Sequence, residues 1–219
     1  MKRNHSKTMD LRRQRGARAR AQILRAANQL FAERGFEGAK TAAIASAAGV
    51  NKALLYYHFR SKDALFKAVM EDHLAEFNRQ AVAMLSSPGP APDLLLRYLC
   101  MHFDFIAART HYAPLWQRLM MADADFASRL ARKYFLPRAR KFAALIRRGV
   151  REGSFRPVNS TQTAISLVGL IVFYFSAAPM VRCIAHIDPF DKANLRKRKR
   201  EVLDFVRFGI FRNPEAKLS

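Results

Sequence analysis

The spacing of apolar residues is the feature that most constrains the fold of this chain. Between residues 18 and 34, apolar side chains recur three or four positions apart, which places them on one face of an amphipathic helix. These side chains are Ile23, Ala26, Ala27, Leu30 and Phe31. No segment keeps the two-residue alternation of a half-buried strand, and the sequence has no internal repeat. The pattern therefore predicts an all-α fold.

Capping residues and glycines divide the next stretch into short helices. Gly35 and Gly49 are typical of positions just past a helix end. Thr41, Asn51 and Ser61 are typical of the residue that precedes and caps a helix. The expected helices cover residues 18–34, 42–47, 52–58 and 62–85.

A cluster of proline, glycine and serine at Ser86–Pro92 is expected to form a loop, and it is a candidate boundary between two lobes. Asp123 and Asp125 are expected to cap the start of a later helix. The helices beyond the loop are expected at about 93–108, 113–121, 124–152, 160–182 and 192–211. The chain is therefore predicted to form a small N-terminal helical unit and a larger helical bundle.

The segment from Gly35 to Met70 has the arrangement of a helix-turn-helix. Two helices flank a tight turn at residues 48–50. The residues expected to pack between them are Ala43, Ile44, Ala47, Val50, Leu55 and Phe59. The second helix carries Lys52, Tyr56 and His58, whose polar tips suit a major groove. Lys62, at the start of the next helix, suits a phosphate because it joins a cation to exposed backbone N–H groups.

At these residues the chain resembles the TetR/AcrR family of bacterial transcriptional regulators. The resemblance covers roughly residues 23–66 and rests on the runs ILRAANQLFAERGFEG, TAAIASAAGV and LYYHFRSKDALF. It implies that Thr41 caps its helix against a phosphate, that Lys52, Ala53 and Leu54 face base or sugar edges, and that Tyr56, Tyr57, His58 and Lys62 clamp the DNA backbone. Ala42 and Leu54 depart from the residues common in relatives, so base specificity does not carry over.

The charge is strongly positive, with 39 Lys and Arg against 17 Asp and Glu, a net +22. Such a balance favours nucleic acid or an anionic membrane as a partner. Residues 1–17 are expected to form a basic arm that either contacts DNA or stays a solvated tail. Residues 129–156 and the run RKRKR at 196–200 carry a further surplus, which could serve solubility, a long-range field or an acidic ligand.

The C-terminal lobe looks like that of the CecR-type subgroup from Glu152 to Gly209. This likeness implies a homodimer formed by helices 160–182 and 192–211. The expected interface residues are Ser166, Gly169, Leu170, Phe173, Ala177 and Phe205. The uncharged run at 164–181 suits such an interface, although it also reaches the lower length limit of a membrane span.

Family resemblance also implies a small-molecule pocket inside the lobe, lined by aromatic and methionine side chains. The candidates are Phe103, Phe105, Trp116, Met120, Met121, Phe126, Tyr134 and Phe173. Each of them could equally be a core residue. His102 and His111 could orient a polar ligand or be satisfied in the core. His186 and Asp188 are too few to predict a metal site, and no cofactor is expected.

The resulting expectation is a basic arm at 1–17, a DNA-binding helix-turn-helix domain at 18–62, and a ligand-binding and dimerisation domain at 63–219. The function expected is a repressor that binds a near-palindromic operator as a dimer and is released by a small effector. A nonspecific nucleic-acid-binding protein and a membrane-associated basic protein are the alternatives. No catalytic motif is present, so an enzyme is not expected. Cys100 and Cys183 are expected as reduced core residues of a cytoplasmic protein.

Overall fold

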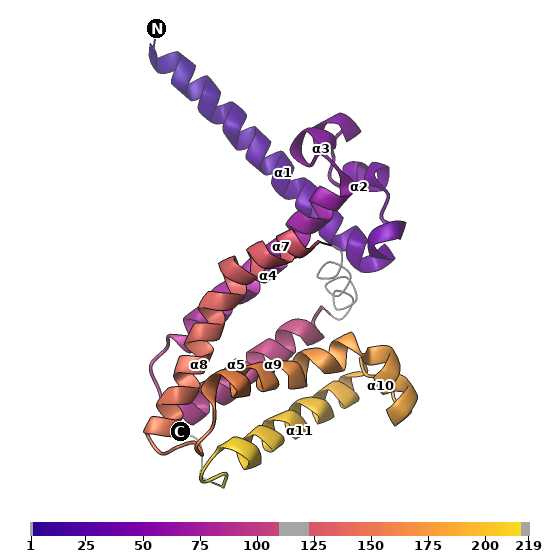
Figure 1. Cartoon of the computed structure of the whole chain (residues 1–219). Coiled ribbons are helices and arrows are strands. Elements are labelled where there is room, and N and C mark those ends of the chain that lie inside the picture. The colour runs from indigo at the N-terminus through magenta and orange to yellow at the C-terminus, as the bar shows by residue number, and fades with distance from the viewer. Residues whose placement is uncertain (1, 110–122, 216–219) are drawn as a thin grey trace. The chain divides into compact units, whose positions relative to one another are not determined.

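The computed structural model describes residues 2–109 and 123–215, with side chains from Arg13 onward. Over these ranges every regular element is a helix, and a single antiparallel bridge joins Phe155 to Phe211. The predicted all-α fold is therefore confirmed. The helices form two compact units that divide between His73 and Leu74, within α4 (Figure 1).

The first unit begins with a helix longer than the sequence predicted. Helix α1 starts at Lys2 instead of Arg18, so residues 2–17 continue the helix instead of forming a separate arm. Its dihedral angles leave the helical region at Gly35, as expected, and a last turn ends at Gly38. The helices of this unit are α1 (Lys2–Gly38), α2 (Thr41–Ala47), α3 (Lys52–His58) and the first part of α4 (Lys62–Leu85).

Two of the three predicted caps in this unit are confirmed. The Asn51 side chain accepts a hydrogen bond from the N–H of Leu54 at 2.7 Å, and the Ser61 hydroxyl accepts one from the N–H of Ala64 at 3.0 Å. The prediction for Thr41 was wrong. Lys40 is the extended residue before α2, and its side chain makes no capping bond, so Thr41 is the first helical residue.

The core of the first unit follows the predicted face of α1, whose five apolar residues are all buried. Leu55 and Phe59 pack beneath α3 as expected. The buried residues of α2 are Ile44 and Ala45, and Ala48 follows them on the same face, while Ala47 is exposed. Ala47 was therefore assigned to the wrong face, because neighbouring alanines give the hydrophobic pattern no contrast.

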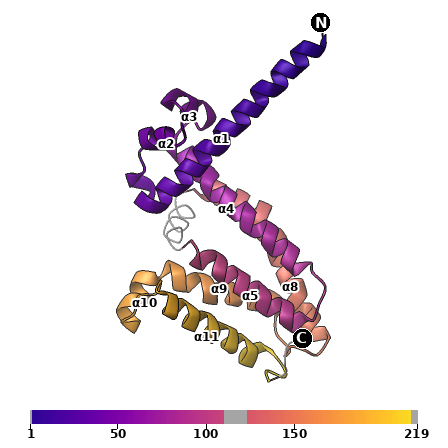
Figure 2. The ribbon, with the colours of Figure 1, turned by 180° about the vertical axis from the view of Figure 1, so that it is seen from behind.

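The second unit surrounds a larger apolar core. In it α8 packs against α5 and α9, and α11 packs against the same two helices (Figure 1 and Figure 2). Its elements after α4 are α5 (Ala91–Ala107), α7 (Ala124–Leu130), the π-helix η1 (Ala131–Phe135), α8 (Leu136–Arg151), α9 (Ser160–Ser176), α10 (Ala178–Ala185) and α11 (Lys192–Ile210). The loop predicted at Ser86–Pro92 covers residues 86–90, because α5 already begins at Ala91. It connects α4 to α5 inside this unit, so it is not where the two compact units divide.

The helix predicted over residues 160–182 is broken. Helix α9 ends at Ser176, and α10 starts at Ala178 with its axis bent by 79°. Pro179 lies in the first turn of α10, where its missing N–H costs nothing, whereas inside a continuous helix it would remove a hydrogen bond. Among the described residues, no single helix has the length and apolarity to cross a membrane, and only this bent pair meets those criteria together. Cys183 on α10 is exposed, so its assignment to the core was wrong.

Candidate functional site

A tight glycine turn sets the angle between α2 and α3. The N–H of Val50 bonds to the carbonyl of Ala45 at 3.0 Å, and the N–H of Gly49 bonds to that of Ser46 at 3.0 Å. Together these two bonds form a Schellman motif, which needs a left-handed residue just past the helix. Gly49 supplies it with φ of 66°. The turn therefore stops α2 and aims the chain into the Asn51 cap of α3.

The outward face of α3 carries most of the residues predicted to contact DNA. Lys52, Ala53 and Tyr56 are exposed, and Tyr57 is 81% exposed. Leu54 is half-buried. Leu55 is buried on the opposite side of α3. This short helix is therefore packed against the core on one side and presents polar side chains to solvent on the other.

Tyr56 links the two helices of the motif. Its hydroxyl lies 3.3 Å from the hydroxyl of Thr41 at the start of α2. The Lys52 ammonium lies 5.9 Å from the centroid of the Tyr56 ring. Thr41, although not a cap, is therefore brought together with Tyr56 and Lys52 at one surface of the motif.

Lys62 lies at the start of α4, close to the end of α1. Its ammonium donates a hydrogen bond to the Glu37 carbonyl at 3.3 Å and lies 4.6 Å from the centroid of the Phe36 ring. An ammonium has three N–H donors, so this bond leaves donors for a further acceptor. The predicted phosphate contact of Lys62 stays a prediction.

His58 is half-buried, unlike its exposed neighbour Tyr57. Its Nε2 atom is buried and has no hydrogen-bond partner among the described residues. The ring lies beside α1, where a Cβ built on Gly16 would be 3.9 Å from its Cε1 atom. One turn later in α1, the Arg20 guanidinium lies 5.1 Å from the centroid of the Phe59 ring. The end of α3 is thus packed against α1, so His58 is less accessible than the sequence suggested.

Two exposed cations of this motif were missed by the sequence analysis. Lys40 directly precedes α2, and Arg60 follows α3. Both could have been found from their positions, because a cation next to a short predicted helix lies at the edge of the surface which that helix presents.

The predicted pocket residues are not all brought together. Phe103 packs edge-on against Phe175 in the core, with 5.1 Å between the ring centroids. The ring centroids of Phe105 and Phe77 are 4.9 Å apart. Phe126 and Tyr134 are buried along α7 and η1. Phe173 is 60% exposed, so it belongs to the outer surface of α9 instead of the interior. Trp116, Met120, Met121 and His111 lie outside the described residues.

Two polar side chains are buried in the core of the second unit, of which the sequence analysis named His102 and missed Arg138. Arg138 on α8 is 6% exposed, and His102 on α5 is 5% exposed. Burial, together with the charge of Arg138, lowers the pKa of His102 from 6.5 to about 3, so the ring is neutral. Its Nδ1 atom has no hydrogen-bond partner among the described residues.

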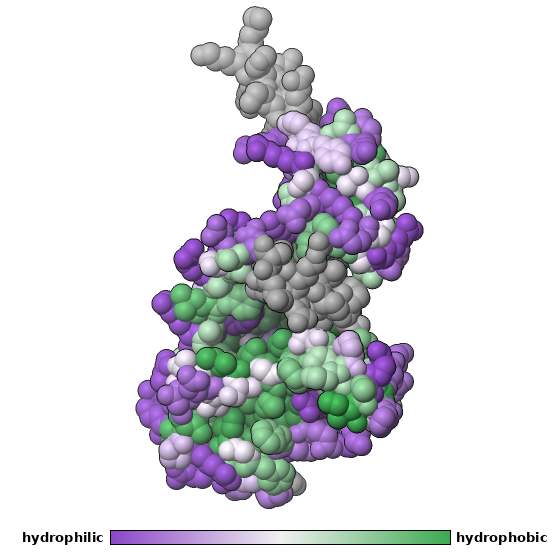
Figure 3. Space-filling view, turned by 45° about the vertical axis from the view of Figure 1, so that its right-hand side comes forward, coloured by the Kyte–Doolittle hydropathy of each residue, from purple (hydrophilic) through white to green (hydrophobic). Residues whose placement is uncertain are grey.

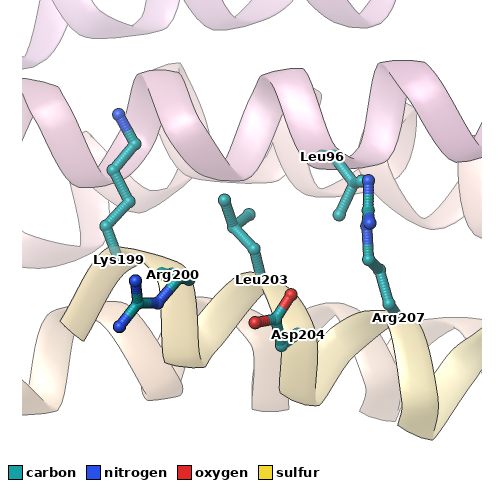
Figure 4. A pocket seen from close by; sticks show the side chains of 6 residues that line it. All are labelled: Leu96, Lys199, Arg200, Leu203, Asp204 and Arg207. Atoms are coloured by element: carbon teal, nitrogen blue, oxygen red, sulfur yellow. The ribbon is translucent and has the colours of Figure 1, made fainter. Parts of the chain in front are cut away.

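A groove of about 380 Å³ lies on the surface between α5 and α11 (Figure 4). Its lining residues are Leu96, Lys199, Arg200, Leu203, Asp204 and Arg207. Lys199 is paired with Asp104 of α5, with its ammonium 2.9 and 2.6 Å from the two carboxylate oxygens. Part of the basic surplus of α11 therefore fastens this helix to α5.

Figure 3 shows apolar surface on one face of the second unit, and apolar side chains are exposed along the last helices of that unit. They are Ile165, Val172, Phe173, Met180, Ile184, Phe205 and Phe208. Of the predicted interface residues, Ser166 and Gly169 are exposed as well, while Leu170 and Ala177 are half-buried. Among the described residues, no three His, Cys, Asp or Glu side chains cluster closely enough to hold a metal ion.

Two family descriptions match this chain in sequence. "Bacterial regulatory proteins, tetR family" matches residues 23–69, and "Tetracyclin repressor-like, C-terminal domain" matches residues 93–206, more than half of the chain. The second match does not bear on the likeness to CecR-type proteins, which stays a prediction.

Individual relatives agree with these matches. The HTH-type transcriptional repressor NicS of Pseudomonas putida is 39% identical over 89 residues, which span 41% of this chain and 42% of NicS. A putative transcriptional regulator from Saccharomonospora viridis in complex with choline has a TM-score of 0.72 at 20% identity, covering 90% of this chain and 100% of that one. AibR in complex with isovaleryl coenzyme A and operator DNA has a TM-score of 0.66 at 18% identity, covering 86% of this chain and 97% of the AibR chain. At such identities these two structures support the fold alone.

Proposed function

Because the chain belongs to the TetR family of bacterial regulatory proteins, we propose that it is a ligand-responsive transcriptional repressor. It binds a near-palindromic DNA operator as a homodimer and is released by a small-molecule effector. The observation that carries this proposal is the outward face of α3, where Lys52, Tyr56 and Tyr57 stand exposed on a capped helix-turn-helix.

The proposed DNA contacts divide into two kinds. Lys52, Ala53 and Leu54 lie at the start of α3, the end that reads base edges when a recognition helix enters a major groove. Thr41, Tyr56, Tyr57, His58 and Lys62 hold the phosphate backbone. Lys40 and Arg60 join this second group, because both are exposed cations that flank the motif.

The exposed apolar face of α9, α10 and α11 supports the homodimer. A contiguous apolar surface is uncommon on a monomer and marks a protein–protein interface. Ile165 is 62% exposed, Phe173 60% and Phe205 67%. Burial of these side chains against a second copy would remove them from water and fix the separation of two recognition helices at about 34–36 Å.

The effector would act through linkage. A ligand that prefers a conformation with the wrong helix separation weakens DNA binding by its differential affinity. The choline and isovaleryl coenzyme A complexes of the structural relatives support a small organic effector for this chain as well. As a DNA-binding regulator of a bacterial family, the protein would work in the cytoplasm.

The proposal is tested by selecting bound sequences from a random DNA pool and measuring the affinity of the selected site by fluorescence anisotropy. We expect a two-fold symmetric site bound at least about 10³-fold more tightly than random DNA. Lys52→Ala is expected to change the sequence preference, whereas Tyr56→Ala weakens binding to selected and random DNA alike. Lys192→Ala, at the exposed start of α11, is the matched control and should leave both affinities unchanged.

Equal affinity for selected and random DNA would contradict the proposal and favour a nonspecific nucleic-acid-binding protein. A charged substitution on the apolar face, Phe173→Glu, tests the dimer by sedimentation velocity. An unchanged sedimentation coefficient would remove α9 from the interface.

A further inference from the structure

The second unit buries a cation that has no carboxylate partner among the residues that the structure describes. Arg138 is 6% exposed, and its Nη1 atom has no hydrogen-bond partner among the described residues. Residues 110–122, which lie outside that description, contain no Asp or Glu in their sequence. A buried charge without a partner costs free energy, so the position of this arginine points to an anion that arrives from outside.

Two aromatic rings lie against the guanidinium of Arg138. Its central carbon lies 4.7 Å from the centroid of the Phe77 ring and 4.9 Å from that of the Phe135 ring. Ring faces attract the cation but accept no ordinary hydrogen bond from its N–H groups. The rings therefore position Arg138 and leave N–H groups available for a planar anion.

Two further polar side chains lie near Phe77. His102 packs against the Phe77 ring, and Tyr98 packs against His102. The His102 ring is 4.7 Å from the Phe77 ring and 5.9 Å from the Tyr98 ring, centroid to centroid. Burial keeps His102 neutral, and it raises the pKa of Tyr98, so the phenol keeps its proton. Arg138, His102 and Tyr98 thus offer one positive charge and two neutral hydrogen-bonding groups inside the unit.

The π-helix η1 helps to bring Arg138 inside. Buried residues recur every four positions along this segment, at Phe126, Leu130, Tyr134, Arg138 and Phe142. In an α-helix, four residues overshoot a full turn by about 40°, so such a series would drift away from the core. The wider π turn at Ala131–Phe135 reduces that drift. Single π turns are frequent at functional sites.

We propose that Arg138, His102 and Tyr98 bind the carboxylate of a small organic acid, whose apolar body packs against neighbouring aromatic side chains such as Phe77 and Phe105. This inference deepens the proposed function, because the acid would be the effector of the repressor. A singly charged carboxylate matches the single unpaired cation and can accept two N–H bonds from a guanidinium. A phosphate dianion would bring a second negative charge that these neutral partners do not balance.

The test uses the free full-length protein, without DNA. Its thermal unfolding is followed with phenylacetate, with the neutral analogue phenylacetamide and with phenyl phosphate at equal concentration and ionic strength. We expect phenylacetate, at several times its Kd, to raise Tm by about 2–4 °C, and the other two to raise it less. No shift with phenylacetate, an equal shift with phenylacetamide, or a larger shift with phenyl phosphate would overturn the carboxylate assignment.

Variants locate the site. Arg138→Met should abolish the shift caused by phenylacetate, whereas Arg140→Met, on the exposed side of the same helix, should retain it. His102→Phe gives a second variant and should reduce the shift. Retention of the full shift in Arg138→Met would overturn the site. Since DNA is absent from these measurements, failure here leaves the selected-DNA experiment standing, and failure of that experiment leaves this one standing.

Discussion

In the first unit, the cations around the helix-turn-helix are at the surface, and Lys40, Lys52 and Arg60 are all exposed. In the second unit, Arg138 is 6% exposed and its guanidinium lies against two aromatic rings. The exposed cations keep their water and cost little in the free protein. The buried cation has already lost its water during folding, so an anion that reaches it meets a stronger field. The same residue type therefore suits a diffuse polyanion in one place and a single small anion in the other.

Salt should separate the two kinds of binding by the largest margin. If Lys40, Arg60 and Lys62 of each of two copies contact phosphates, affinity for DNA should fall by about 10³-fold between 50 and 200 mM salt. Phenylacetate binding at Arg138 should change far less, because a buried pair is screened weakly. Anisotropy titrations and thermal shifts across this range measure both. Equal salt dependence would break the comparison.

Lowering the pH should destabilise the second unit. The pKa of His102 is lowered to about 3 by burial and by Arg138, whereas the unfolded chain protonates it near 6.5. The unfolded state therefore binds the proton first, and stability present above pH 6.5 is lost as the pH falls toward 3. Between pH 7 and 5 we expect a loss of about 2 kcal/mol. Urea unfolding at both pH values checks this, and His102→Phe should flatten the dependence. If the free energy of unfolding of His102→Phe depended on pH as strongly as that of the unmodified protein, His102 would not be the group responsible.

Substitutions at the helix starts of the first unit should have a smaller effect on stability, and they distinguish a capping residue from a DNA-contacting one. Asn51→Ala removes a formed cap of α3 and should cost about 1 kcal/mol of stability. Thr41→Ala removes no cap and should cost a few tenths at most, although it should weaken DNA binding if Thr41 contacts a phosphate. Thermal unfolding of the two variants distinguishes the roles. Equal losses would restore Thr41 as a cap.

The sequence predicted the first unit well because its signals are local. Asn51 and Ser61 satisfy N–H groups three residues away, so their roles can be read without knowledge of the fold. Thr41 was misassigned since the chain becomes helical only after Lys40, and threonine is common both before a helix and within its first turn. The break at Ala177 was missed because the long uncharged run was interpreted as one continuous helix, although Pro179 lies within it.

Tertiary context explains what the sequence could not predict in the second unit. An arginine in a helix usually lies on the side that faces solvent. The π turn that carries Arg138 toward the core has no recognised signal in the sequence. Phe173 was a candidate for both pocket and interface, since an aromatic residue on an apolar helix gives no direction by itself. The structure separates these roles through its 60% exposure.

The continuity of α1 has a consequence for the energetics of DNA recognition. A flexible tail would surrender its backbone conformational entropy at the moment it met the duplex. Here residues 2–17 are already helical, and the neighbouring turns of α1 rest on α3 through Gly16 beside His58 and Arg20 over Phe59. That ordering cost is met when the protein folds, so the basic segment and the recognition helix meet a duplex as one preorganised body.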